Sequence, residues 1–142
     1  MKKWFNVDIT TDIDGPVPSV FACLKNIDAW NTWTNSIIKS RGLSKKKWER
    51  GFRLEFSSSY LPVPVRLKVF EYKVDECIAW GMSFPLFLLV HRFTFSSLKN
   101  NRCRVHSEEY SSGVLGFLAL PLAKGIARLD HQWMKDMSDH FK

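Results

Sequence analysis

Two polar residues, His91 and Glu109, occupy positions that alternation assigns to buried faces of strands. His91 alternates with Leu89 and Phe93, and Glu109 continues a set that begins at Cys103. Because side chains two residues apart share one face of a strand, both polar groups point toward the protein interior. A buried carboxylate costs several kcal/mol unless it is paired or protonated.

These positions leave two interpretations open. Each residue could be a hydrogen-bonded structural residue, His91 within the core and Glu109 near the end of the sheet. Alternatively, both face one cavity, where a His–Glu pair could hold a ligand carbonyl or act as an acid–base couple. The strand pattern does not establish that the two side chains meet, so His91 and Glu109 are only weak catalytic candidates and no catalytic residue is assigned.

The remaining polar residues predict no cofactor and no metal site. None of His106, His131 and His140 has metal-ligand spacing to another His, Cys or carboxylate. The serines at 57–59 lack the Gly-x-Ser-x-Gly elbow of a hydrolase, and the chain has no glycine-rich phosphate loop.

Composition predicts one globular domain over residues 1–142. The hydrophobic fraction is 45%, and the aromatic fraction of 14% is high enough to line an apolar pocket as well as a core. The three cysteines lack metal or redox spacing, and residues 1–8 lack the apolar core of a signal peptide. The longest apolar run, residues 84–90, is too short to span a membrane. We therefore expect a cytoplasmic protein with free, largely buried thiols.

The formal net charge is +7, with one basic cluster around a loop. Its members are Lys39, Arg41, Lys45, Lys46, Lys47 and Arg50. The cluster is interpreted either as a solvated loop and rim or as contact with an anionic partner. Nucleic acid is not the expected partner, because no RNA-binding aromatic signature or DNA-reading helix accompanies it. Brief contact with a membrane surface and the oligomeric state stay open.

The elements that must position His91 and Glu109 are strands followed by a long helix. A half-buried strand at residues 5–10 precedes two short helices, and about six strands joined by short turns follow, which predicts an antiparallel sheet. From residue 114 onward, apolar residues recur at gaps of three or four, as on one stripe of a helix. Pro121 predicts a break between Gly116 and Pro121, with the regular helix from about Leu122 to His140.

Five segments in this order resemble the SRPBCC superfamily, which has the START-like or helix-grip fold, and especially its polyketide cyclase/dehydrase and lipid-transport group. The segments are residues 18–24, 28–33, 78–81, 91–95 and 108–113. The resemblance implies an α+β protein in which a curved seven-stranded antiparallel sheet wraps around the long C-terminal helix. It also implies an internal cavity between sheet and helix that takes apolar molecules such as lipids, polyketides or quinones.

Three functions remain open from the sequence. The first is binding or transport of a small hydrophobic ligand. The second is a cyclase or dehydratase in which His91, Glu109 or Tyr60 moves protons, and the third is a ligand-free interaction or stress-related domain. For the first, the predicted ligand-binding residues are Trp33, Phe56, Trp80, Met82, His91, Phe93, Glu109, Leu122, Ile126 and Leu129. The helix near Leu122, Ile126 and Leu129 is expected to form a cavity wall, and the part from Trp133 onward is expected to be packed core.

Overall fold

The computed structural model describes residues 2–45 and 47–142, so Lys46 of the basic cluster lies outside the described residues. Seven antiparallel strands form one sheet in the order β1-β7-β6-β5-β4-β3-β2. The strands are β1 (Lys3–Ile13), β2 (Ile37–Gly42), β3 (Arg53–Ser58), β4 (Val65–Lys73), β5 (Cys77–Phe84), β6 (Phe87–Leu98) and β7 (Arg102–Ser112). The first strand pairs with the last, which brings the start of the chain beside the segment that leads into the C-terminal helix.

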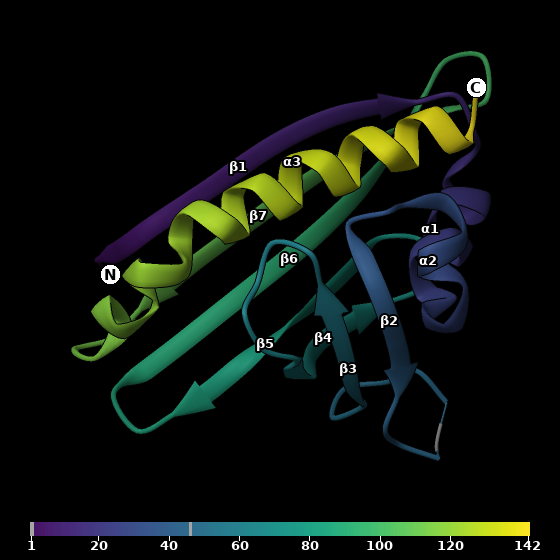
Figure 1. Cartoon of the computed structure of the whole chain (residues 1–142). Coiled ribbons are helices and arrows are strands. Elements are labelled where there is room, and N and C mark those ends of the chain that lie inside the picture. Colours follow the sequence, from purple (N-terminus) through teal and green to yellow (C-terminus); the bar gives the residue numbers. More distant parts are fainter. Residues whose placement is uncertain (1, 46) are drawn as a thin grey trace.

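The helices cover the concave side of this sheet (Figure 1). Between β1 and β2 lie α1 (Val17–Lys25), the 3₁₀ turn η1 (Ile27–Ala29) and α2 (Trp30–Trp33). After β7 come the 3₁₀ segment η2 (Gly116–Leu122) and the long helix α3 (Ala123–His140). The predicted helix-grip architecture is confirmed, with the two short helices near the end of α3 and the β5–β6 turn near its start.

Pro121 sets the start of the long helix. It falls inside η2, and regular α-helix begins two residues later, at Ala123. Proline has no N–H to donate and its ring crowds the preceding turn, so a tighter 3₁₀ segment takes the place of the first helical turns. The predicted break is confirmed, and α3 ends at His140 as expected.

The core is centred on three tryptophans from different elements. The Trp30 ring centroid lies 4.8 Å from that of Trp133 on α3 and 5.6 Å from that of Trp80 on β5. The Trp30 indole N–H also donates to the Leu24 carbonyl at 2.8 Å, so its one polar atom is satisfied inside the core. This cluster fixes α2 and α3 against the sheet.

The pairing between β4 and β5 is irregular and ends before β5 does. A register shift lies between Val69 and Glu71, as at a β-bulge. The paired register of these strands ends at Lys68 opposite Gly81, although β5 continues to Phe84. Leu67 and Met82, the next residues on the two strands, are therefore not part of the hydrogen-bonded pairing.

All three cysteines are free thiols; Cys77 and Cys103 are buried and Cys23 is half-buried. Burial raises the pKa of the Cys23 thiol to about 11, which keeps it protonated at neutral pH. Within the described residues, no helix has both the length and the apolar character needed to cross a membrane.

Candidate functional site

His91 and Glu109 lie directly opposite each other on β6 and β7. The Nδ1 atom of His91 is 3.2 Å from Oε1 of Glu109. Both side chains point inward, because their neighbours in alternation, Phe93 and Ser107, are also buried. The two residues that the sequence could not bring together therefore share one site.

A third polar group, Asp130, reaches this site from α3. Its Oδ1 atom lies 4.0 Å from Nδ1 of His91, and only 1% of the residue is exposed. Apart from the neighbouring carboxyl of Glu109, neither of its oxygens has a hydrogen-bond partner. Asp130 is not among the residues predicted from the sequence, although a signal is present: it stands four residues after Ile126 and three before Trp133, on the apolar stripe of the helix.

The His91 ring is held in place from several sides. Its Nε2 atom lies 2.8 Å from Oγ of Ser107, and its ring centroid is 4.2 Å from that of Phe93. The Trp80 ring lies edge-on at 5.9 Å. With Nε2 engaged by Ser107, Nδ1 is the atom that faces the two carboxyls.

Burial controls the charges of this cluster. It lowers the pKa of His91 to about 3, so that the imidazole is neutral. Burial raises the pKa of Glu109 well above its usual range, and the nearby Asp130 raises it further. Burial also raises the pKa of Asp130 to about 7, although the hydrogen bond with Glu109 acts in the opposite direction. Within the described residues, no lysine or arginine forms an ion pair with either carboxyl.

The cluster closes one side of an internal cavity between the sheet and α3. The cavity offers about 60 Å³ to solvent-sized molecules, enough for a few waters. Its walls are mainly apolar and include eight of the ten residues proposed from the sequence. These are Phe56, Trp80, Met82, His91, Glu109, Leu122, Ile126 and Leu129.

Trp33 and Phe93, the other two proposed residues, do not line this cavity. Trp33 stacks on the far side of Trp133, at 6.2 Å between centroids, and also approaches His140. Phe93 is buried two residues after His91 on β6, and its ring centroid lies 5.8 Å from that of Trp133. Both residues instead pack against Trp133, and alternation cannot show which inward residues reach a cavity.

The expected division of the long helix needs one correction. Ile126 and Leu129 line the cavity as expected, and the half-exposed Leu122 lies at its edge. Trp133, however, lines the cavity as well, so the wall extends one turn further than expected. Tightly packed core begins after it, and Met137 is completely buried away from the cavity.

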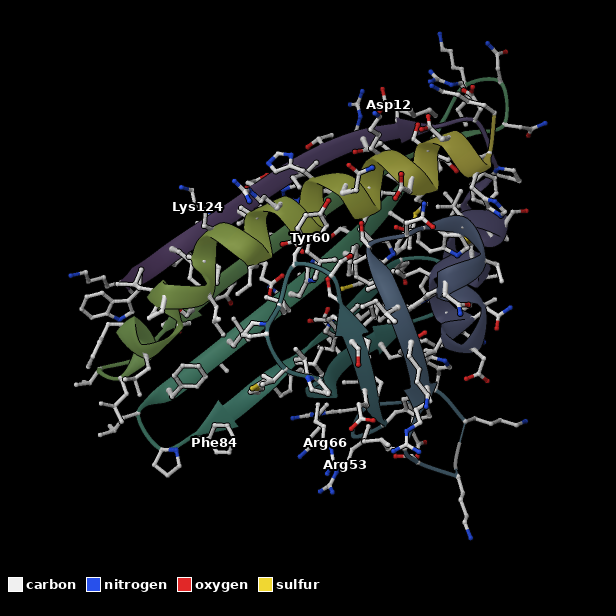
Figure 2. All side chains as sticks on the ribbon, viewed as in Figure 1. Asp12, Arg53, Tyr60, Arg66, Phe84 and Lys124 are labelled. Atoms are coloured by element: carbon white, nitrogen blue, oxygen red, sulfur yellow. The ribbon has the colours of Figure 1, made fainter. Side chains whose placement is uncertain are left out.

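A turn between β3 and β4 covers the cavity next to α3. Gly125 permits this approach: a Cβ atom at that position would stand 2.5 Å from the Tyr60 carbonyl oxygen and 3.5 Å from a methyl of Leu61. Leu61 lines the cavity, whereas Tyr60 lies over the outer side of the helix (Figure 2). The structure therefore does not bring the Tyr60 side chain to His91 and Glu109.

The basic cluster is also separate from the cavity. Its described members lie on β2 and on the loop before β3, and none of them lines the cavity. Arg41 instead forms an ion pair with Glu55, which also accepts from Arg66 at 2.7 Å on the outer face of the sheet. Arg66 points away from α3 in Figure 2.

No protein-family model and no curated protein matches this chain. Solved structures do match it in fold. A START superfamily protein from Mycobacterium smegmatis is 11% identical with a TM-score of 0.75, over 96% of each chain. The fold of this chain is START-like. A hypothetical protein from Helicobacter pylori has a TM-score of 0.74 at 16% identity, over 97% of this chain and 88% of its own.

The START-like fold also occurs in the di-domain ARO/CYC protein BexL of the BE-7585A biosynthetic pathway. It is 13% identical with a TM-score of 0.73, over 97% of this chain and 50% of its own. These likenesses concern the fold. In this chain, the fold places a mostly apolar cavity and one polar cluster between β5, β6, β7 and α3.

Proposed function

We propose that this protein binds a small, largely apolar molecule in the cavity, with a hydroxyl or carbonyl group of that molecule facing Asp130 and Glu109. The observation that carries the proposal is the buried Asp130 carboxyl, which faces the cavity with no partner other than Glu109. An unsatisfied buried polar atom costs about 1–3 kcal/mol. A ligand hydroxyl would remove that cost by donating a hydrogen bond, while the apolar walls hold the rest of the molecule.

The size of the cavity bears on the kind of ligand. Pockets for drug-sized ligands usually measure about 300–1,000 Å³. The 60 Å³ in this closed form admits only a few heavy atoms, so a larger ligand, from a single aromatic ring to a polyketide, requires the β3–β4 turn to move away from α3. Leu61 on this turn and Met82 on β5 line the cavity and are half-buried, so neither is enclosed on all sides.

An enzyme is the second candidate, and the His91–Glu109 pair is the observation that favours it. A neutral imidazole beside a carboxyl that holds its proton could move a proton to and from a bound carbonyl compound. The fold likeness to the ARO/CYC protein supports this alternative as well as ligand binding. The 3.2 Å separation of the two side chains permits the transfer but does not itself select a reaction.

Phenol and toluene form a matched pair of probes, because they differ mainly in a hydroxyl and a methyl group. We expect both to bind to the wild-type protein when they are titrated against tryptophan fluorescence, since Trp80 and Trp133 line the cavity. Ile126→Trp should fill the cavity and abolish binding of both probes. The control is Leu118→Trp, because Leu118 is exposed on η2 and does not line the cavity.

The polar end of the site is tested by Asp130→Leu. Hydrogen bonds to charged groups contribute about 1.5–3 kcal/mol, so the ratio of phenol to toluene affinity should fall about tenfold or more in this variant. An unchanged ratio would show that the carboxyl does not contact the ligand. Binding that survives Ile126→Trp would place the ligand outside the cavity and overturn the proposal.

A further inference from the structure

Three possible metal ligands converge at the inner wall of the cavity. His91 Nδ1, one oxygen of Glu109 and one oxygen of Asp130 all lie within 4.8 Å of one another. Metal–ligand bonds of about 2.0–2.2 Å place neighbouring donors of a tetrahedral ion roughly 3.3–3.6 Å apart. The 3.2 Å between His91 and Glu109 is already near this value, and the 4.0 Å between His91 and Asp130 requires an approach of well under about 1 Å.

The surroundings of His91 are those of a metal-binding histidine. Such a histidine usually donates its other ring N–H to an oxygen, which fixes the tautomer and the ring orientation. Here Nε2 lies 2.8 Å from Ser107 Oγ. In the tautomer in which Nε2–H donates to that oxygen, the lone pair of Nδ1 points toward the carboxyls. The three donors come from β6, β7 and α3, which are regular elements rather than loops.

Charge balance supplies a separate argument. When both carboxyls release their protons to a bound ion, they and the neutral imidazole carry a charge of −2, which one divalent cation neutralises. Among the described residues, no lysine or arginine pairs with Glu109 or Asp130, and Asp130 is 99% buried with both oxygens lacking a partner outside the cluster. An ion between the two carboxyls would give the buried oxygens of Asp130 a partner without any change elsewhere in the core.

We propose that His91, Glu109 and Asp130 bind one divalent transition-metal ion, such as Zn²⁺, with an open coordination position toward the cavity. One nitrogen and two carboxylate oxygens suit Zn²⁺, Co²⁺, Mn²⁺ or Fe²⁺. Three protein ligands leave a place for a water or a ligand oxygen, as in catalytic rather than structural zinc sites. This inference rests on the same cavity as the proposed function, but its test needs no apolar ligand.

Cobalt is the probe, because its ligand-field absorption reports coordination directly. Protein without an affinity tag is freed of metal with a chelator and titrated with Co²⁺, and Zn²⁺ binding is measured by calorimetry. We expect one ion per chain. Glu109→Gln and Asp130→Asn should each weaken binding by at least about tenfold, and Ser107→Ala by about 10- to 100-fold through the orientation of His91.

The matched control removes another histidine–carboxylate pair. His106 Nε2 lies 2.6 Å from Asp8 Oδ1 on the exposed face of the sheet. The double variant Asp8→Asn, His106→Gln should bind Co²⁺ as the wild type does. Circular dichroism checks the fold of every variant, and the wild-type titration stands without any of them.

Several results would overturn the inference: no stoichiometric Co²⁺ binding, adventitious binding by several weak sites, or binding that survives both carboxyl substitutions. If Co²⁺ fails to bind while phenol and toluene still do, only the metal site is wrong. If Co²⁺ binds but the apolar probes do not, the metal site stands and the proposed function fails.

Discussion

His91 on β6 and Glu109 on β7 form a directly opposed cross-strand pair, with Nδ1 of the histidine 3.2 Å from Oε1 of the glutamate. Antiparallel register makes this meeting unavoidable once both residues face inward, because opposed side chains lie closer together than any other pair on the two strands. Asp130 on α3 is the third member of the cluster, with Oδ1 4.0 Å from Nδ1 of His91.

The buried Asp130 predicts a distinctive dependence of stability on pH in protein freed of metal. Its pKa is raised from 3.8 to about 7, so the folded state binds a proton more readily than the unfolded state. The free energy of unfolding should therefore fall as pH rises from about 4 through 7. The pKa of Glu109 is also raised, so this residue contributes to the same fall. Asp130→Asn should therefore reduce the fall, and it should stabilise the protein at pH 8 by on the order of 2 kcal/mol. Urea unfolding at several pH values measures it.

Asp139→Asn is the control for that experiment, because Asp139 is an exposed carboxylate near the end of the same helix. It should leave the pH profile unchanged.

His91 affects the pH dependence of stability in the opposite direction. Its pKa is lowered to about 3, so the stability gained by keeping it neutral is lost as pH falls from about 6.5 to 3. A wild-type profile that Asp130→Asn does not alter would contradict the charge assignment.

Gly125→Ala should displace the cover of the cavity. Alanine is the better helix former by about 1 kcal/mol, but its Cβ would stand 2.5 Å from the Tyr60 carbonyl oxygen. The β3–β4 turn must therefore move, and we expect a net destabilisation of about 1–2 kcal/mol together with faster amide exchange at Tyr60 and Leu61. Exchange rates equal to those of the wild type would show that the turn does not rest on the helix.

Two members of the polar cluster follow from the sequence, and the third does not. Alternation is sufficient to place His91 inward with Leu89 and Phe93, and to place Glu109 on the face that carries Cys103 and Val105. Asp130 could be predicted only by treating an acidic residue on an apolar helical stripe as a sign of a buried site. The residues it meets, His91 and Glu109, stand 20 or more residues earlier in the chain. The extent of the cavity wall could not be predicted, because a helical stripe shows which side is buried but not how tightly Trp133 or Met137 packs.

Trp30→Phe tests the tryptophan core that supports α3. Trp30 is fully buried and donates to the Leu24 carbonyl, so its loss removes both packing volume and a buried hydrogen bond. We expect a loss of roughly 2–4 kcal/mol in the free energy of unfolding. Trp4→Phe is the matched control, because Trp4 donates to the Gly113 carbonyl at the same 2.8 Å but is only half-buried. Equal losses in the two variants would contradict the central role of Trp30.

The β5–β6 turn holds an unfavourable residue. Leu86 has a φ of 65° and is 61% exposed, although leucine rarely adopts left-handed backbone. Leu86→Asn should stabilise the protein by roughly 0.5–1 kcal/mol, because asparagine tolerates this conformation. Thermal unfolding of the two proteins gives the difference, and a lower midpoint for the variant would mean that Leu86 makes stabilising contacts.

The proposed function requires that the cavity hold an apolar molecule with its polar group on the cluster. A crystal structure of the wild-type protein grown with phenol is the decisive experiment. We expect phenol between Ile126, Trp80 and Trp133, with its oxygen within hydrogen-bonding distance of Asp130 or Glu109. An unoccupied cavity at saturating phenol, or phenol bound only on the outer surface, would contradict it.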